Sequence, residues 1–503
     1  MIPPQPEFDL TPHQPQRPLF WSDAILDLQE LISTFDSSIQ IYIVGGAVRD
    51  AWLHRPIKDL DLAVGNRAVA HSAIKLARQI ANRLEGDVYV LDDERDIARV
   101  IYHLSNGDDL NLDIAAFRGE DLLADLRDRD FTLNAMAIDL RRDPGLLIDP
   151  LGGEQDLKDK RIRRCSPDAI ATDVIRGLRA VRQSVQLGFR LDAATLADIR
   201  SQAGHLRETS NERIRDELFK ILSLTRPSAA LRVADRLGLV GVIIPDFARL
   251  QSIATATSKV PTNQWEHTLL VMDKLTTLIS AISFGRTDNT ASTFELGMVV
   301  IQFDRYRKRL NDHLNAVWTN DRPHRALMML AALLHDTGDV DQDNQPEASA
   351  VIAEHYADDL RLSNAEKQRM LLMIKHHHHQ VFSQPITPLI AHRYWYRLGE
   401  AGVDVILLKL ADTLGTQAHT LVHSDWLVLV ERAVMLLDGY YLHHDEIVVP
   451  VPLVDGNQLK KDLQLQPGPV IGELLTLIRE GQVEGRIQTV DEALAAARDY
   501  LSR

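Results

Sequence analysis

Residues 41 to 64 read IYIVGGAVRDAWLHRPIKDLDLAV, and this stretch decides the fold of the first part of the chain. An apolar run enters two glycines, Gly45 and Gly46, and a second apolar run closes the stretch. The pattern predicts a strand, a short helix and another strand. Asp59 and Asp61 are two residues apart on the second strand, so their side chains point to the same face.

These two carboxylates can hold a hard cation between them. Mg²⁺ prefers one or two carboxylates together with phosphate oxygens and water. Gly45 and Gly46 lack side chains, so backbone N–H groups there can approach a phosphate closely. A lone Asp-x-Asp pair is common at solvated strand ends, but a pair that follows a strand and a double glycine favours catalysis. The stretch therefore predicts a metal-dependent phosphoryl or nucleotidyl transfer site.

Length and composition indicate an ordinary globular protein of several domains. The chain has 503 residues, of which 45% are apolar and 25% charged, and this length suggests three or four domains. Residues 1 to 37 begin with a proline-rich stretch, which predicts a disordered or extended lead before a first helix. No apolar run approaches the roughly eighteen residues of a membrane helix. The single cysteine, Cys165, is consistent with a reducing cytoplasm. The oligomeric state is left open.

The charge is unevenly distributed along the chain. A net charge of −15 argues against a nucleic-acid partner at first. Residues 158 to 226, however, hold fifteen Lys and Arg against nine Asp and Glu. A basic segment in an acidic protein can be a local footprint for a polyanion, and ordinary solvated helix faces are the alternative.

The hydrophobic patterns predict an α+β fold. Residues 38 to about 155 mix β-branched runs with two helical stretches, which indicates a head with a small mixed sheet. From residue 165 onward apolar residues recur at spacings of three and four. The rest of the chain should therefore be nearly all helical.

Further polar residues could complete a nucleotide site. Asp113, on a later strand, could be a third carboxylate beside the first two, or a strand-edge residue that faces water. Arg129 could bind a triphosphate, and Asp130 a ribose hydroxyl. Asp173 and Arg176 are expected on one face at the start of a helix. An acceptor beside a forked donor can read the edge of a base, and an intrahelical ion pair is the alternative.

Five motifs resemble, in this order, those of the class II tRNA nucleotidyltransferase and bacterial poly(A) polymerase family. They are GGAVRD with Asp59 and Asp61, RDFTLNA from Arg129, DPLGG from Asp149, the pair Asp173 and Arg176, and NERI from Asn211. The resemblance implies a polymerase-β-like head, Mg²⁺ on Asp59 and Asp61, selection of CTP or ATP, and a tRNA 3′ end along the basic neck. The candidate catalytic residues are Asp59, Asp61 and Asp113. The candidate nucleotide-binding residues are Gly45, Gly46, Arg49, Arg129, Asp130, Asn134, Asp173, Arg176 and Arg179.

Two departures from the family pattern concern specificity. Thr172 stands where the family usually has Glu before the base-reading Asp, and we expect this to loosen the orientation of Arg176. Only ten residues separate Arg118 from Arg129, where members that add the complete CCA usually have a flexible loop. Members restricted to adding CC are similar in lacking that loop, so a CC-adding enzyme is a hypothesis. A poly(A) polymerase acting on general RNA 3′ ends is an alternative.

The second half of the chain predicts a metal site of another kind. His267, His335, Asp336 and Asp412 lie on helical patterns and can converge in a bundle on one divalent metal. Their spacing resembles the HD phosphohydrolase superfamily. The four consecutive histidines from His376 to His379 could add further ligands, with His376 as the first candidate, although such a run can equally be a polar helix end. A metal-dependent phosphohydrolase with a sensor head is therefore an alternative of a different class.

The resemblance also divides the chain. The expected parts are a lead at 1–37, a nucleotidyltransferase head at 38–157, a basic helical neck at 158–226, a helical linker at 227–261, an HD domain at 262–420 and a helical tail at 421–503. The tail is similar to the C-terminal segment of tRNA nucleotidyltransferases that carry an HD domain.

Overall fold

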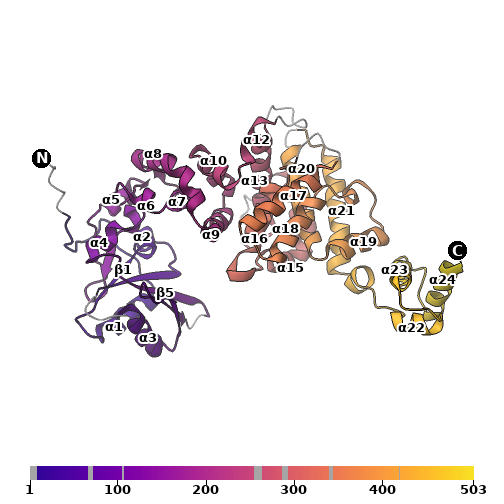
Figure 1. Cartoon of the computed structure of the whole chain (residues 1–503), viewed down its shortest axis with the longest axis horizontal. Coiled ribbons are helices and arrows are strands. Elements are labelled where there is room, and N and C mark those ends of the chain that lie inside the picture. Colours follow the sequence, from indigo (N-terminus) through magenta and orange to yellow (C-terminus); the bar gives the residue numbers. More distant parts are fainter. Residues whose placement is uncertain are drawn as a thin grey trace. The chain divides into compact units, whose positions relative to one another are not determined.

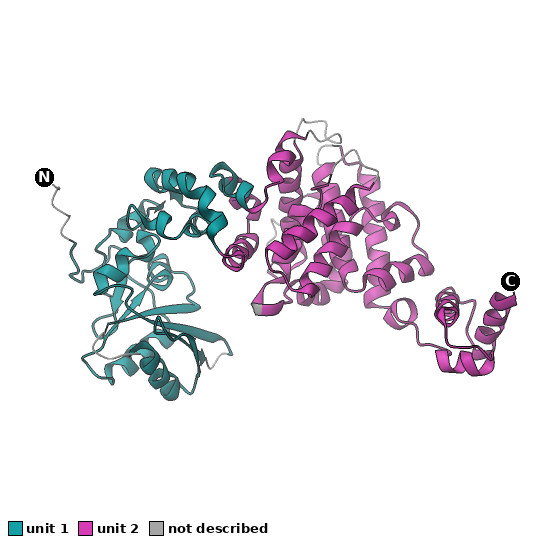
Figure 2. Ribbon diagram, viewed as in Figure 1, with its two compact units in different colours: residues 1–209, 233–242 teal, residues 210–232, 243–503 magenta. Residues whose placement is uncertain are grey.

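The chain forms two compact units, each with its own core (Figure 2). Unit 1 comprises Met1–Thr209 with Val233–Val242, and unit 2 comprises Ser210–Arg232 with Ile243–Arg503. The computed structural model describes residues 8–65, 72–104, 107–253, 263–285, 293–338, 344–417 and 420–502. The expected boundary between linker and HD domain, at 261/262, lies outside these described residues.

Six strands of unit 1 form one mixed sheet in the order β3-β4-β5-β2-β1-β6. The strands are β1 (Gln40–Val44), β2 (Asp59–Gly65), β3 (Asp87–Asp92), β4 (Ile97–His103), β5 (Asp109–Ala116) and β6 (Ala137–Asp139). β2 and β5 pair in parallel, and the other neighbours pair antiparallel. The mixed sheet expected for the head is therefore confirmed.

Alternation along the central strands gives the sheet two different faces. Leu60 and Leu62 of β2, with Leu112 of β5, are at most 1% exposed on one face. Helix α3 (Ser72–Leu84) packs against β3, β4 and β5 (Figure 1). The alternate residues of β2 and β5 carry the carboxylates on the other face.

Short helices complete unit 1. They are α1 (Asp23–Ser33), α2 (Gly46–Leu53), α4 (Leu122–Arg127), α5 (Gly153–Lys158), α6 (Ala169–Thr172), α7 (Arg176–Leu187) and α8 (Ala193–Gln202), with the 3₁₀ turns η1 (Thr132–Asn134) and η2 (Ala203–Glu208). Before α1 the chain runs extended, and His13 N–H donates to Leu147 O at 2.9 Å. Strand β7 (Arg161–Ile162) follows α5, and strand β8 (Arg190–Leu191) follows α7. The two strands pair in parallel and so connect the segments that follow these helices.

Unit 2 is helical, as the spacing of apolar residues predicts. Its helices are α9 (Asn211–Leu222), α12 (Phe247–Ser252), α13 (Gln264–Ile282), α14 (Phe294–Phe303), α15 (Arg307–Leu314), α16 (His324–Leu334), α17 (Gln345–Asp359), α18 (Asn364–His376), α19 (Pro388–Leu398), α20 (Ala401–Thr416), α21 (His423–Tyr441), α22 (Gly456–Asp462), α23 (Pro469–Val483) and α24 (Val490–Ser502). Two further helices, α10 (Pro227–Arg236) and α11 (Val240–Ile243), lie where the chain passes between the units. The last three helices share a small core around Leu459, Leu474 and Ile478.

Candidate active site

The turn between β1 and α2 requires glycine at position 45. Gly45 has φ 79° and ψ −144°, a backbone conformation that is essentially confined to glycine. A Cβ atom at this position would lie 2.6 Å from Asp61 Oδ2 and 3.2 Å from Arg129 Nη1. The missing side chain therefore brings the turn, a carboxylate and a guanidinium together at one point.

The candidate carboxylates form a row across the polar face of the sheet. Because β2 and β5 are parallel, Asp59 lies beside Asn111 and Asp61 lies beside Asp113. Asn111 Nδ2 donates to Asp59 Oδ1 at 2.9 Å. The sequence pattern gave no expectation for Asn111, although it stands two residues before Asp113 on the same strand.

The environment of Asp61 favours a bound cation. Burial raises the pKa of Asp61, and the neighbouring carboxylates of Asp113 and Asp59 raise it further. Arg129 and Arg118 act in the opposite direction. A divalent cation would neutralise this concentration of negative charge, and carboxylate oxygens are the ligands that Mg²⁺ prefers. The donor set therefore fits a hard cation at Asp59 and Asp61.

Arg129 is fixed beside this row by Asp125. Its Nε and Nη2 atoms donate to Asp125 Oδ2 at 3.0 and 2.9 Å. The residue Asp125 is only 1% exposed. Its other oxygen, Oδ1, accepts a hydrogen bond from Arg118 N at 3.1 Å. Asp125 thus anchors α4 to the strand end and leaves Nη1 of Arg129 toward Gly45.

The remaining candidates of the head form a hydrogen-bonded chain. Arg49 Nη1 donates to Asn134 Oδ1 at 2.7 Å, and Asn134 Nδ2 donates to Asp130 Oδ1 at 2.9 Å. Asn134 Nδ2 also lies 3.1 Å from Gln183 Oε1, and Arg179 lies 3.8 Å from the second oxygen of Asp130. These contacts join residues that lie up to 85 positions apart in the sequence. A guanidinium, an amide and a carboxylate are therefore presented together.

The expected helical pair of Asp173 and Arg176 needs a correction. Asp173 has extended backbone angles and ends α6, so it does not belong to the helix that Arg176 begins. The two side chains still approach to 3.9 Å across this turn. Arg176, 7% exposed, donates to the carbonyl oxygens of Asp128, Arg129 and Ala169 at 2.7 to 3.3 Å. These backbone contacts, and not a shared helix face, fix its guanidinium.

Besides Asn111, sequence reasoning missed three side chains that contact the candidates, Arg99, Asp125 and Gln183. It also missed Arg118, whose charge acts on Asp61. Asp125 stands four residues before Arg129 on a short helix, a spacing that predicts contact and could have revealed it. The others reach the site through strand register or through helix packing, which local spacing does not encode.

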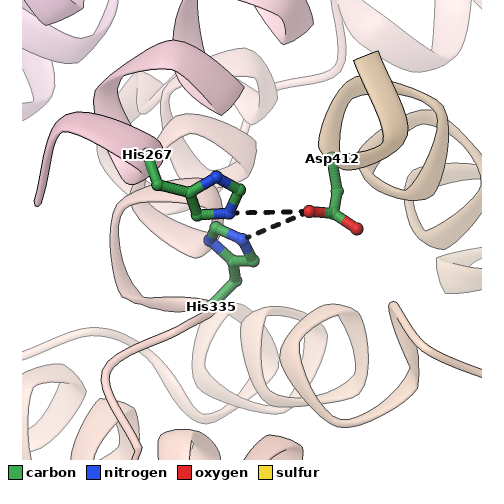
Figure 3. A group of neighbouring side chains, drawn as sticks. All are labelled: His267, His335 and Asp412. Atoms are coloured by element: carbon green, nitrogen blue, oxygen red, sulfur yellow. Dashed lines mark ion pairs between the residues drawn. The ribbon is translucent and has the colours of Figure 1, made fainter. Parts of the chain in front are cut away.

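A second cluster lies in unit 2, where His267 of α13, His335 after α16 and Asp412 of α20 point toward one another (Figure 3). His267 Nε2 lies 3.7 Å from Asp412 Oδ1, and His335 Nε2 lies 4.0 Å from the same oxygen. Asp336 joins them, at 3.3 Å from His267 Nε2. Residues that are up to 145 positions apart in the sequence thus come together from two helices and the end of a third.

Hydrogen bonds fix the tautomers of two histidines in this cluster. His335 Nδ1 lies 2.8 Å from Ala332 O, and His377 Nδ1 lies 2.7 Å from Ile374 O. A carbonyl only accepts, so both Nδ1 atoms carry the proton and both Nε2 atoms present a lone pair. These Nε2 atoms are buried and have no hydrogen-bond partner among the described residues. Burial also lowers the pKa of His335, so the ring is neutral. The cluster therefore fits a divalent metal.

Of the four consecutive histidines, His377 joins this cluster, in place of the first candidate, His376. His377 Nε2 lies 3.6 Å from Asp336 Oδ1. His376 is the last residue of α18 and packs against the His379 ring, with centroids 5.7 Å apart. His377 keeps helical backbone angles and follows the buried residues Met373 and Ile374 by four and three positions, so it continues the buried face of α18.

A third cluster, His313, His324 and Asp404, is a closed hydrogen-bond network. His313 Nε2 and His324 Nε2 lie 2.6 and 2.9 Å from the same oxygen of Asp404. Trp318 Nε1 donates to His324 Nδ1 at 3.1 Å, so the proton of His324 is on Nε2. Arg369 donates to the second oxygen of Asp404. Both ring nitrogens of each histidine are engaged in hydrogen bonds, so we assign this cluster a structural role.

Three protein-family models match the chain. The Poly A polymerase head domain matches residues 41–163. The family described as the probable RNA and SrmB-binding site of polymerase A matches 188–250, and the putative tRNA nucleotidyltransferase domain 2 matches 431–497. The first of these ranges contains the carboxylate row and the Gly45 turn.

Curated relatives extend the match to most of the chain. A CC-adding tRNA nucleotidyltransferase of Geobacter sulfurreducens is 41% identical over 40% of this chain and 45% of its own length. An A-adding tRNA nucleotidyltransferase of Deinococcus radiodurans is 28% identical over 90% of this chain and 94% of its own. A CC-adding tRNA nucleotidyltransferase of Synechocystis sp. is 28% identical over 94% and 97%.

Solved structures share the fold over a similar extent. The Thermotoga maritima CCA-adding enzyme complexed with tRNA is 22% identical, with a TM-score of 0.57 over 96% of both chains. The fold, the carboxylate row and the family matches define a nucleotidyltransferase. The chain belongs to the class II tRNA nucleotidyltransferase and poly(A) polymerase family. Among the described residues, no helix is both long and apolar enough to span a membrane.

Proposed function

We propose that this chain extends tRNA 3′ ends with cytidine nucleotides from CTP and stops after the second one. The observation that carries nucleotidyl transfer is the row of Asp59, Asp61 and Asp113 beside the Gly45 turn. The tRNA acceptor is supported by relatives of this activity that match nearly the whole chain. The comparisons favour neither a poly(A) polymerase nor a metal-dependent phosphohydrolase whose head serves only as a sensor.

Each group of the head has a role in this reaction. Asp59 and Asp61 would hold Mg²⁺, which supplies charge neutralisation for the triphosphate and activation of the RNA 3′ hydroxyl. Arg129, oriented by Asp125, would bind the triphosphate at the Gly45 turn. Asp130 would accept from the ribose, and Arg176 with Asp173 would select the base, because a fixed fork beside an acceptor presents both polarities.

Termination after two cytidines is supported by the segment between Arg118 and Arg129. Helix α4 occupies most of it, and Asp121 caps this helix by accepting from Ala124 N at 2.8 Å. Asp125 binds both ends of the segment. A segment tied at both ends offers no long mobile loop. Addition of a single A is the second candidate, because the Deinococcus radiodurans relative of nearly full length is A-adding.

The helical cluster of unit 2 would bind a second divalent metal. Its ligands would be His267, His335, Asp336, Asp412 and His377, and a phosphohydrolase activity of this cluster is a separate proposal. The head at 38–157 would carry transfer, and the basic neck at 158–226 would hold RNA. A cytoplasmic location belongs to the same proposal, because Cys165 alone can form no internal disulfide.

Transcripts of tRNA ending at the discriminator base, at C and at CC test this function with each labelled nucleotide in turn. Addition of two C and no A, resolved on a sequencing gel, is the expected result. Addition of A alone to the CC transcript would establish the second candidate. Long A tails on unrelated RNA would contradict both.

Asp59→Ala should abolish incorporation and leave tRNA binding within about twofold of the unaltered chain. The matched control is Asp87→Asn, a carboxylate on the edge strand β3 whose side chain is 61% exposed. Incorporation should persist in this control. Activity retained in the Asp59 variant would refute the assignment of the site. Cyclic-nucleotide hydrolysis that disappears in His335→Ala but persists in Asp59→Ala would establish the separate activity of unit 2.

A further inference from the structure

Arg99 extends the carboxylate row by one strand. In the antiparallel pair of β4 and β5, Arg99 lies directly beside Asp113, and Asp113 lies directly beside Asp61 in the parallel pair with β2. Side chains of directly paired residues share one face of a sheet. Arg99, Asp113 and Asp61 therefore stand side by side on the face of the candidate metal site.

Arg99 engages both oxygens of Asp113. Its Nε donates to Oδ1 at 2.7 Å, and its Nη2 donates to Oδ2 at 2.8 Å. The side chains are 40% and 28% exposed, so neither is sealed in the core. A fork that meets a carboxylate with two parallel bonds fixes its orientation and offsets its charge.

The three carboxylates differ in the donors that they meet. Asp61 accepts no hydrogen bond from any described residue, and Asp59 accepts one, from Asn111. Asp113 accepts two, both charge-assisted. The capacity to bind a cation is thus greatest at Asp61, intermediate at Asp59 and smallest at Asp113.

We propose that Arg99 is a positioning residue that withholds Asp113 from the divalent cation held by Asp59 and Asp61. Asp59 and Asp61 alone form the strong cation site, and a second cation binds weakly because it must compete with Arg99 for Asp113. The inference rests on the proposed function, since it concerns the metal site of that reaction. It assigns to Arg99 control over the number of cations that the head holds.

Binding of Mn²⁺ to the full chain, without nucleotide or RNA, tests the inference directly. The electron paramagnetic resonance signal of free aqueous Mn²⁺ gives the number and affinity of bound ions. A chain with Asp59→Asn, Asp61→Asn and Asp113→Asn together is the blank, because it keeps the ions that unit 2 binds. The difference isolates the ions of the head.

The unaltered head should bind one ion strongly and a second weakly. Arg99→Ala should strengthen the second ion about fivefold, the scale of a half-exposed ion pair. Arg99→Lys, with a single point charge in place of the fork, should give a smaller change. Asp113→Asn should lose the second ion and keep the first within about twofold. The combined Arg99→Ala and Asp113→Asn chain should match Asp113→Asn.

Two results would overturn the inference. One is loss of the strong ion in Asp113→Asn, which would make Asp113 a primary ligand despite Arg99. The other is an Arg99→Ala chain, folded by circular dichroism, whose two affinities are unchanged or both weaker. Asp113→Asn decides the question even where Arg99→Ala does not fold. Failure of the proposed function is distinguishable, because Asp59→Asn would then leave the strong ion in place.

Discussion

At the scale of single residues, the site depends on the absence of a side chain. The space that a Cβ would need at position 45 is taken by Asp61 and Arg129. The chain adopts φ 79° there in order to place the N-terminus of α2 next to these groups. Gly45 therefore combines a backbone requirement with a steric one, and the two can be separated by experiment.

Gly45→Ala should lower incorporation about a hundredfold, because displacement of Asp61 and Arg129 by about 1 Å misaligns the reacting groups. The matched control is Gly399→Ala. Gly399 has a similar conformation, φ 51° and ψ −140°, but a Cβ there meets nothing within 4 Å. Both variants bear backbone strain of roughly 1 to 3 kcal/mol. Single-turnover extension of tRNA measures the difference, and equal activity of the two variants would show that contact at Gly45 is unimportant.

The same scale shows which residues the sequence could predict. Asp59 and Asp61 follow from strand alternation, which needs no knowledge of the tertiary fold. Arg99 reaches the site through the register of β4 against β5, and no local pattern encodes that register. The choice of His377 over His376 depends on which face of α18 is buried, and the spacing of His377 from Met373 and Ile374 places it on that face.

At the scale of elements, four helices of unit 2 meet at one buried carboxylate. Asp404 of α20 is 0% exposed and binds His313 of α15, His324 of α16 and Arg369 of α18. Glu400, which precedes α20, adds a contact to His313 Nδ1 at 3.2 Å. Such a network is stable only while its charges remain paired, so it couples helix packing to pH.

The unfolding free energy of unit 2 should fall as pH rises from about 7 to 9. Burial alone would lower the pKa of His313, but Asp404 and Glu400 outweigh it and raise that pKa to about 9. The unfolded value is about 6.5, so the stabilisation is complete below 6.5 and is lost as pH rises through 9. Asp404 and Glu400, with lowered pKa values, stay charged throughout. The expected loss is on the order of 2 kcal/mol.

Urea titrations followed by tryptophan fluorescence at several pH values measure this loss, since four of the six tryptophans lie in unit 2. His313→Gln should be less stable at pH 6 and should show a flatter dependence. His355→Gln is the control, because His355 is 72% exposed and belongs to the same unit. An equally steep dependence in His313→Gln would show that the titrating group lies elsewhere.

At the scale of the whole molecule, element types were easier to predict than contacts. Strand and helix periods identified the α+β head and the helical remainder, because alternation and 3.6-residue spacing are local properties. The partition of the chain was harder: unit 1 includes Val233–Val242, although Ser210–Arg232 belongs to unit 2. The segment Val233–Val242 belongs to unit 1 because Leu237 and Leu239, both at most 3% exposed, pack in its core. The composition of the segment does not reveal this packing.

Two compact units with separate candidate metal clusters should respond independently to metal and to mutation. A ligand that binds only the folded state stabilises it in proportion to its affinity and concentration. Mn²⁺ at about a hundredfold excess over its dissociation constant should raise the unfolding temperature of unit 2 by roughly 5 °C. Scanning calorimetry of the full chain should show this shift in Asp59→Ala but not in His335→Ala. Extension of tRNA should show the opposite pattern.

His377→Ala should also lose the shift, whereas His376→Ala, one position away, should keep it. Loss of the shift in His376→Ala with its retention in His377→Ala would contradict the ligand set, which rests on the hydrogen bond of His377 Nδ1 and on the approach of its Nε2 to Asp336.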